Sequence, residues 1–350
     1  MFADLEVFDL STVLAGPSVA SFFAELGAKV TKIEHPIHGD VTRTWRIPGE
    51  KQEVTSYFSS INFGKEYITK DLTLPSDYSW LLDRLPTVDV LIMNFKSSDY
   101  LKFNLTKETL HAINPRLIIG SISGFGDNSD RVAYDLILQA ESGIMAMNGE
   151  PDGSPTKMPI ALIDVLAAHQ LKEALLLAIL KREKTNLGSW VSVSLYDAAV
   201  CSLVNQASAF LMNGIIPTRM GSLHPNIAPY GEIFRTKDKK LVTFAVGSDR
   251  QFQTLCKVLG CELISSNLDY ETNEDRVKNR IKLMEELAPY VLMYEAKELS
   301  DLTLEHLIPL GIIKSLDEVF ETMEANALIR EEKQGTTVTK RVTQLAFKWK

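Results

Sequence analysis

The chain has 350 residues, of which 45% are hydrophobic and 23% charged, as in globular proteins large enough for two domains. Its formal net charge of -8 argues against nucleic acid as the main partner, because the phosphates would be repelled. We find no secretion signal and no stretch of about 18 apolar residues, so we predict no membrane span and expect a cytoplasmic protein.

The first 125 residues alternate between apolar strand patterns and helical segments. Helices are predicted over residues 18–26 and 77–85. Strands are predicted over residues 5–10, 29–34, 67–69, 88–93 and 117–122. This alternation is typical of an α/β fold, in which a parallel sheet is joined by crossover helices, and it predicts a large Rossmann-like domain.

Helical patterns dominate after Tyr134, until a stretch rich in proline and glycine at residues 214–231 indicates a domain boundary. Helices are predicted over residues 133–147, 164–184 and 196–212, with a strand over 190–195. A strand over 240–245 and a helix over 250–259 then begin a smaller α/β domain. We predict domains over residues 1–213 and 214–325, with a C-terminal segment, 326–350, whose last fifteen residues look β-like and exposed.

The cysteines and histidines give no metal-binding pattern. Cys201, Cys256 and Cys261 are an odd and small set, which argues against disulfides and indicates buried thiols. Only His35 and His38 are close in sequence, and no further ligand lies near them. We therefore predict no metal site.

Glycine-rich loops offer only weak signs of a phosphate site. The first strand is followed by a single glycine, Gly16, whereas the dinucleotide fingerprint needs three spaced glycines. This absence argues against a nicotinamide-dependent dehydrogenase. Gly120, Gly124 and Gly126 follow a later strand, and there a flexible loop and a ligand contact are about equally compatible with the sequence.

Three acidic residues stand where helices are predicted to begin: Asp135, Asp164 and Asp249. Each of them could simply cap its helix. The same position also favours an ionised carboxylate, which can attack an acyl carbon. For Asp164 the local sequence favours the cap, and composition does not rank the three residues.

A set of ordered motifs then resembles the family III CoA-transferases, also called the CaiB/BaiF family. The resemblance runs over most of the chain, from about residue 5 to about residue 329. The motifs are VFDLSTVLAGP (7–17), KIEHPIHGDVTR (32–43), KEYITKDL (65–72), Asn94-Phe95, YDLILQAESGIMAMNG (134–149), GEPDGSP (149–155), LHPNIAPY (223–230) and GSDRQF (247–252).

The resemblance implies an acyl-CoA:carboxylate CoA-transferase with Asp164 as its nucleophile. In the family this aspartate forms a mixed anhydride with the acyl group and then an aspartyl-CoA thioester. The segments 134–149 and 149–155 look closest to members that use succinyl-CoA, which implies succinate or another dicarboxylate. The family also implies an interlocked homodimer, an acyl-CoA donor, a carboxylic acid acceptor and no metal.

Further site residues are carried over from the family by position. Five of them match residues near the adenosine diphosphate part of coenzyme A: Arg43, Lys65, Asn94, Phe95 and Lys96. Three match the substrate side: Leu14, Tyr134 and Gly221, the last in a loop that closes over the intermediates.

The sequence also departs from the family pattern in places. Leu14 replaces the glutamine of formyl-CoA transferase, which disfavours oxalate or formate and suits a less polar acyl group. Glu66 follows Lys65 where many members have a basic residue, and the chain stops short of the usual C-terminal segment. Both departures could weaken the binding of coenzyme A.

Two alternatives stay open. A 2-methylacyl-CoA racemase shares this fold, but related racemases have a histidine where this chain has Tyr134. A tyrosine, with an ordinary pKa near 10, is a poor base at neutral pH, so the substitution favours transfer over racemisation. The second alternative is a protein that binds CoA esters without turnover.

Overall fold

The computed structural model describes residues 1–334 and 336–348. Gly335 lies outside the described residues, as do residues 349–350 of the predicted β-like terminus. The chain divides into two units, described separately here. The first contains residues 1–145, 157–216 and 326–350, and the second contains 146–156 and 217–325. Residues 146–156, expected in the large domain, therefore cluster with the second unit.

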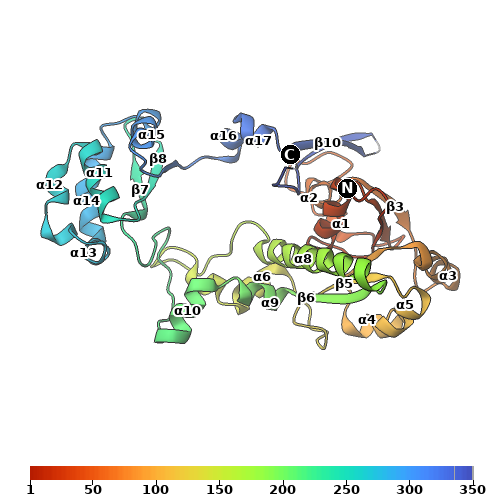
Figure 1. Ribbon diagram of the computed structural model, residues 1–350. Coiled ribbons are helices and arrows are strands. Elements are labelled where there is room, and N and C mark those ends of the chain that lie inside the picture. The colour runs from red at the N-terminus through yellow and green to blue at the C-terminus, as the bar shows by residue number, and fades with distance from the viewer. Residues whose placement is uncertain (335, 349–350) are drawn as a thin grey trace. The chain divides into compact units, whose positions relative to one another are not determined.

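A six-stranded, fully parallel sheet forms the centre of the first unit (Figure 1), in the order β3-β2-β1-β4-β5-β6. Its strands are β1 (Glu6–Asp9), β2 (Lys29–Glu34), β3 (Lys65–Thr69), β4 (Val90–Met93), β5 (Ile118–Ser123) and β6 (Ser189–Ser194). The predicted α/β class with a parallel sheet is confirmed, whereas the interlocked dimer stays a prediction.

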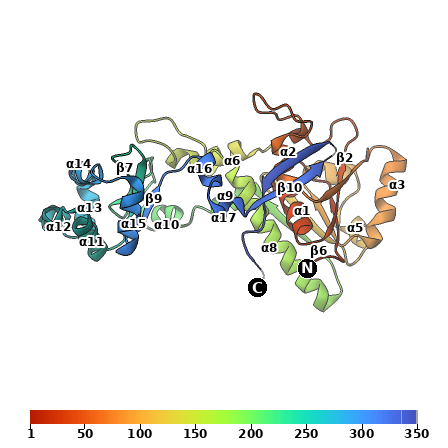
Figure 2. The ribbon, with the colours of Figure 1, turned by 90° about the horizontal axis from the view of Figure 1, so that it is seen from above.

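Side chains of the central strands alternate between two hydrophobic cores because successive residues of a strand point to opposite faces. Val7 packs into a core with α1 (Ala15–Glu25) and α8 (Leu162–Thr185), whereas Phe8 packs into a core with α3 (Pro75–Arg84) and α5 (Lys107–Ile113). Figure 2 shows α1 and α8 on one face of the sheet and α3 on the other. The sheet is therefore a middle layer between helices.

Several predicted helices have different limits in the structure. The predicted helix 133–147 is two helices, α6 (Asp135–Glu141) and α7 (Ile144–Met147), because Gly143 between them has a left-handed φ of +87°. The predicted helix 196–212 is likewise divided into α9 (Leu195–Cys201) and α10 (Val204–Asn213). The helix predicted from residue 18 begins at Ala15.

The second unit contains a three-stranded antiparallel sheet of β7 (Tyr230–Arg235), β8 (Leu241–Ala245) and β9 (Leu310–Ile312). Strands β7 and β9 were not among the predicted elements. One apolar core unites this sheet with helices α11 (Asp249–Leu259), α14 (Arg280–Val291) and α15 (Ala296–Glu305). Cys256 and Cys261 are buried in this core, but Cys201 of the first unit is exposed, against the prediction.

The shorter elements complete the fold. In the first unit they are η1 (Val41–Arg43), α2 (Ser56–Ile61), η2 (Leu85–Thr87), α4 (Ser97–Lys102), β10 (Ile329–Gln334) and β11 (Thr337–Val342). In the second unit they are α12 (Glu262–Ser265), η3 (Leu268–Tyr270), α13 (Asn273–Lys278) and α16 (Leu316–Phe320), and α17 (Met323–Asn326) follows at the return to the first unit. No described helix is long and apolar enough to cross a membrane.

The C-terminal hairpin of β10 and β11 packs on α2 of the first unit. Arg341 is buried there, forms an ion pair with Glu25 and stacks over the Phe63 ring at 3.7 Å. The predicted exposure therefore holds only for alternate residues of β11, because Thr339 and Arg341 are buried against other parts of the first unit.

Candidate active site

A cavity of about 280 Å³ lies at the carboxyl ends of the central parallel strands. In open α/β sheets, ligands bind at this edge, where the loops after neighbouring strands meet. Its wall consists of Thr12–Ala15 after β1, Asn94–Lys96 after β4, Ile122–Gly124 at the end of β5, Ser129, Arg131–Tyr134, Asp164 and Leu195. The cavity is bounded by residues of the first unit alone.

Six of the nine site residues that the sequence predicted line this cavity: Leu14, Asn94, Phe95, Lys96, Tyr134 and Asp164. They come from four separate segments, so their proximity is a property of the fold. Lys96 is exposed and Tyr134 is half exposed. Gly124 from the glycine cluster also lines the cavity, which favours the ligand-contact interpretation of that loop.

Asp164 is the third residue of α8, and it does not cap the helix. The residue in the capping position is Ala161, which has no side chain able to accept a hydrogen bond. The Asp164 side chain is only 7% exposed and makes no hydrogen bond to another described residue. The interpretation of Asp164 as a cap was therefore wrong, and its carboxylate is left available to the cavity.

The cap of α8 comes instead from Asp135 at the start of α6. Its Oδ1 accepts a hydrogen bond from the Ile163 N–H at 2.7 Å, and its Oδ2 accepts one from Gln139 Nε2 at 2.6 Å. Gln139 Oε1 in turn accepts the Met158 N–H at 2.8 Å. Asp135 and Gln139 thus fix the chain that enters α8, and with it the position of Asp164.

Burial raises the pKa of Asp164 from 3.8 to about 7, with a further contribution from the negative charge of Asp135. The helix N-terminus favours the ionised form of Asp164, but desolvation and the like charge of Asp135 outweigh this effect. Near neutral pH the protonated and ionised forms are therefore both accessible. A shifted carboxyl in a cleft is typical of a catalytic residue.

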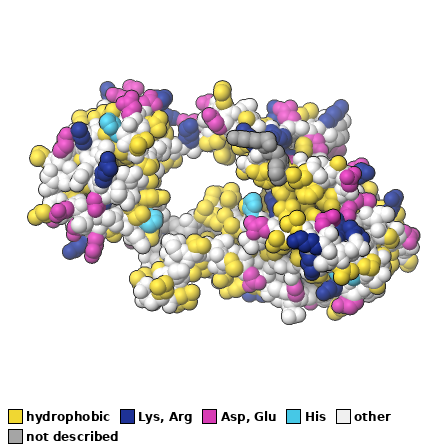
Figure 3. All heavy atoms as spheres, viewed as in Figure 1, with side chains coloured by type: hydrophobic (Ala, Val, Ile, Leu, Met, Phe, Trp, Pro, Cys, Tyr) yellow, Lys and Arg dark blue, Asp and Glu magenta, His cyan; other side chains and the backbone are white. Residues whose placement is uncertain are grey.

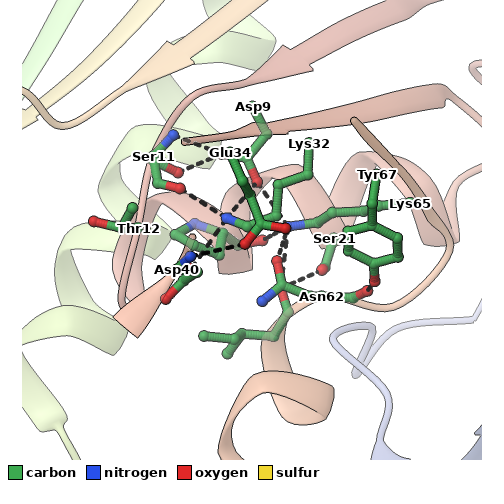
Figure 4. Close-up of polar contacts among 12 residues, drawn as sticks. Asp9, Ser11, Thr12, Ser21, Lys32, Glu34, Asp40, Asn62, Lys65 and Tyr67 are labelled. Atoms are coloured by element: carbon green, nitrogen blue, oxygen red, sulfur yellow. Dashed lines mark hydrogen bonds and ion pairs between the residues drawn. The ribbon is translucent and has the colours of Figure 1, made fainter. Parts of the chain in front are cut away.

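Beneath the loop that follows β1 lies a buried group of charged residues, shown in Figure 4. Asp9, Lys32, Asp40 and Lys65 all have fully buried side chains. Lys65 Nζ lies 2.8 Å from Asp9 Oδ2, and Lys32 Nζ lies 3.1 Å from Asp40 Oδ2. Two positive and two negative charges therefore offset one another inside the protein.

Lys65 and Arg43 do not line the cavity. Lys65 Nζ donates to Asp9, Pro17 O, Ile61 O and Asn62 Oδ1 at 2.8–3.2 Å, so its ammonium is held inside the fold. Arg43 makes three hydrogen bonds to Glu34 at 2.6–3.2 Å. Both side chains have structural partners, which argues against direct contact with coenzyme A.

Gly221 belongs to the second unit, where its N–H donates to Gly149 O at 2.9 Å. The predicted role of this loop in closing over intermediates stays a prediction. Asn94 lines the cavity, but its amide is engaged with the backbone of Thr12 through bonds of 2.9 and 3.0 Å.

The sequence reasoning missed Asp135 as the cap of α8, and it missed Tyr57. Burial raises the pKa of Tyr57 to about 12, with further contributions from Asp164, Asp135 and Asp40, so this phenol lies near the same carboxylates.

Among the described residues, no group of three His, Cys, Asp or Glu side chains is arranged to hold a metal ion. Asp9 and Lys32, charged residues within apolar strands, were the signal in the sequence that could have indicated a buried ionic group.

Comparison with known proteins agrees with the resemblance found in the sequence. The sequence pattern of CoA-transferase family III matches residues 2–350. A succinate–glutarate CoA-transferase of Agrobacterium fabrum is 35% identical over 332 residues, which cover 92% of this chain and 82% of that protein. A succinyl-CoA:mesaconate CoA-transferase of Haloarcula hispanica is 33% identical over 328 residues, covering 91% and 81%. The crystal structure of a CaiB/BaiF family protein from Brucella suis has a TM-score of 0.84 at 32% identity, covering 99% of this chain and 91% of that one.

Proposed function

This chain belongs to CoA-transferase family III and is an acyl-CoA:carboxylate CoA-transferase, and we propose that Asp164 is the nucleophile of the transfer. The observation that carries the proposal is the position of its carboxylate: buried, without a hydrogen-bond partner among the described residues, and on the wall of the cavity. A carboxylate used only for structure would be paired.

The reaction begins with attack of an Asp164 carboxylate oxygen on the carbonyl carbon of the donor thioester. The carbon–sulfur bond breaks, and coenzyme A leaves as a thiolate from a mixed anhydride. The thiolate then attacks the Asp164 carbonyl carbon of the anhydride, which releases the donor carboxylate and leaves an aspartyl-CoA thioester. The acceptor carboxylate repeats these two steps in reverse, so Asp164 is regenerated.

The environment of Asp164 supports this role. Its pKa of about 7 means that the ionised form is more basic than an ordinary carboxylate yet still present at neutral pH. Leu14 and Ala15, at the start of α1, line the same cavity, and their N–H groups have no partner among the described residues. We infer that these N–H groups stabilise the oxyanion, since donors at a helix N-terminus carry partial positive charge.

We infer a dicarboxylate substrate, with succinyl-CoA as the donor. The names of both relatives given above include succinate or succinyl-CoA and a second dicarboxylate. The cavity of about 280 Å³ is near the lower end of ligand pockets, roughly 300–1,000 Å³, so it suits an acyl group rather than the whole of coenzyme A. Apolar Leu14 on its wall is compatible with the methylene groups of such an acid.

Lys96 is the best placed cation for the phosphates of coenzyme A. It is exposed at the rim of the cavity beside Phe95, where its charge acts on Asp130 without a described ion pair. By contrast, the guanidinium of Arg131 on the same wall is paired with Glu141. Lys96 and Phe95 therefore support the predicted binding of coenzyme A better than Arg43 or Lys65 do.

We also infer that the chain forms a homodimer. Apolar side chains are exposed on α8 and α10 of the first unit, and those of α10 are seen as yellow spheres in Figure 3. They include Leu177, Leu180, Phe210, Leu211 and Met212, which are 49–80% exposed. The adjacent residues Phe210, Leu211 and Met212 give α10 an exposed apolar surface of the kind found at protein–protein interfaces, and sedimentation equilibrium would measure the mass of the particle directly.

The test of the proposed function is mass spectrometry of the protein after mixing with acyl-CoA donors. An acyl or CoA adduct on the peptide that contains Asp164 is expected with succinyl-CoA, and none is expected in Asp164→Asn. Asp317→Asn is a matched control, because Asp317 is an exposed acidic residue in the first turn of another helix. Turnover without any adduct, together with exchange of an α-proton into deuterated water, would instead indicate a racemase.

A further inference from the structure

The segment between β1 and α1 is held by side chains at five consecutive backbone polar groups. The Ser11 N–H donates to Asp9 Oδ1 at 3.0 Å, and Ser11 O accepts from Lys32 Nζ at 2.7 Å. Thr12 N–H and Thr12 O both bond to the Asn94 amide, at 3.0 and 2.9 Å. The Val13 N–H donates to Asp40 Oδ1 at 3.3 Å. Side chains outside this short loop, those of Asp9, Lys32, Asp40 and Asn94, therefore determine its backbone conformation.

Val13 shows why such support is needed. Its φ of +73° lies in the left-handed region, which a β-branched residue rarely adopts. A strained backbone persists only where the surroundings over-determine it, and such residues cluster at functional sites. Val13 lines the cavity that holds Asp164.

The pair of Lys32 and Asp40 is the centre of this support (Figure 4). Asp40 Oδ1 accepts from Val13 N–H, from Thr42 N–H at 3.0 Å and from the Thr42 hydroxyl at 2.7 Å, while Lys32 Nζ lies 3.1 Å from the other oxygen. Both side chains have zero exposure. Burying an ion pair contributes little net stability, because desolvation offsets the attraction, so its benefit here is the geometry that it imposes.

The segment that this pair holds leads directly into the start of α1. Leu14 and Ala15 follow Val13 on the cavity wall, and their N–H groups are free of partners among the described residues. A rotation at Val13 would move these donors relative to Asp164. Gly16 adds a close contact, since a Cβ there would lie 2.2 Å from Ser11 Oγ.

We propose that Lys32 and Asp40 are positioning residues for the transfer reaction, which hold Val13 in its left-handed conformation and so keep the first N–H groups of α1 at the wall of the Asp164 cavity. The expected effect of these residues on catalysis rests on the proposed function. Neither residue touches the cavity, because neither belongs to its lining.

The test compares Asp40→Asn with wild type in steady-state transfer from succinyl-CoA, alongside thermal unfolding. In the variant, a buried amide replaces the anion that Lys32 needs. We expect kcat to fall at least about tenfold, since small misplacement of reacting groups can cost about a hundredfold. The KM for the CoA ester should change much less, because the pair does not reach the rim.

Val13→Gly supplies the second variant, since glycine adopts positive φ without strain. Combined with Asp40→Asn it should restore most of the lost kcat, a rescue that a merely structural role of Asp40 would not produce. Asp89→Asn is the matched control. Asp89 lies just before β4, at the amino end of the strand and so away from the cavity, and it forms an ion pair of 2.8 Å with buried Arg182. Its kcat should stay near that of wild type.

If Asp40→Asn does not fold, the double variant Lys32→Met with Asp40→Leu removes both charges and both supports, and the same fall in kcat is expected. A folded variant with wild-type kcat would overturn the inference, as would an equal loss in Asp89→Asn or no rescue by Val13→Gly. If wild type shows no transfer, the proposed function fails instead. A crystal structure of the variant then decides the inference: a positive φ retained at residue 13 would overturn it, and a changed one would support it.

Discussion

Asp135 caps the helix that carries Asp164, and its charge also affects the proton affinity of that residue. The Asp135 Oδ1 accepts the Ile163 N–H at 2.7 Å, one residue before Asp164. The two carboxyl groups are close enough that Asp135 contributes to the raised pKa of Asp164, about 7. One side chain thus influences both the position and the ionisation of the proposed nucleophile.

Asp135→Asn separates these two effects. Asparagine can still accept the Ile163 N–H through its side-chain oxygen, but it has no charge to repel the Asp164 carboxylate. We expect the pKa of Asp164 to fall, and the acid limb of the pH–rate profile for kcat/KM to move to lower pH. Because burial is the larger cause of the shift, the limb should stay above the ordinary value for an aspartate.

The companion variant Asp135→Ala removes the cap as well. It should also lower the melting temperature, because loss of a helix cap costs about 0.5–2 kcal/mol. An acid limb that is identical in wild type and Asp135→Asn would show that Asp135 does not influence the ionisation of Asp164.

Asp164→Asn should be more stable than wild type above neutral pH, although we expect it to be inactive. The pKa of Asp164 is about 7 when folded, against 3.8 unfolded, so between these values the folded chain binds more protons. Stability therefore decreases as pH rises from about 4 to 7, and the full penalty is present above pH 7. The variant lacks this penalty because asparagine has no carboxyl group to ionise.

The check is chemical denaturation of both proteins at pH 4, 6 and 8. The stability difference in favour of Asp164→Asn should be small at pH 4 and largest at pH 8. A difference that is constant across this range would contradict the raised pKa.

Replacement of Lys65 should destabilise the protein rather than weaken the binding of coenzyme A. Lys65→Met leaves Asp9 buried with only Lys32, 3.7 Å away, as a positive partner. Breaking a buried ion pair by removing one partner costs about 3–5 kcal/mol. Urea unfolding should show this loss, while the KM for the CoA ester stays close to that of wild type. This expectation differs from the one drawn from the family resemblance, in which Lys65 lies near the adenosine diphosphate part of coenzyme A.

Lys96→Ala is the matched lysine variant, since its ammonium is exposed at the rim of the cavity. It should raise the KM for CoA esters and leave the melting temperature unchanged. The reverse pattern, a raised KM for Lys65→Met at wild-type stability, would return Lys65 to the binding site.

Gly16→Ala should lower both stability and activity. The added Cβ would lie 2.2 Å from Ser11 Oγ and 2.4 Å from Ser11 Cβ, so the loop after β1 must move away from α1. Overpacking of this kind costs about 1–3 kcal/mol. Gly247→Ala is the control, because its Cβ would meet only the Gln251 Oε1, at 3.7 Å. Equal melting temperatures for the two variants would contradict the expected clash.

Much of the sheet could be predicted from the sequence because strand patterns are local. The β2 strand has the predicted limits, residues 29–34, and the other five parallel strands differ by one or two residues at their ends. Strands β7 and β9 were missed: β7 begins within the proline- and glycine-rich stretch that was predicted as a domain boundary, and β9 has only three residues. Residues 133–147 looked like one helix because the apolar period continues across Gly143.

Six predicted site residues meet at one cavity because their segments follow parallel strands or begin helices at the same edge of the sheet. The burial of Lys65 could not be predicted in this way. A lysine at the start of a strand is usually solvated, and only the tertiary structure brings Asp9 to its ammonium.

The sequence by itself determined the alternation of strands and helices around the parallel sheet, the family, and the residue proposed as the nucleophile, since these depend on local patterns and ordered motifs. The tertiary structure decided the ionisation of Asp164, the cap supplied by Asp135, and the burial of Lys32, Asp40 and Lys65. Desolvation and charge pairing depend on which residues the fold brings within a few ångströms, and these partners are up to 56 positions apart in the chain.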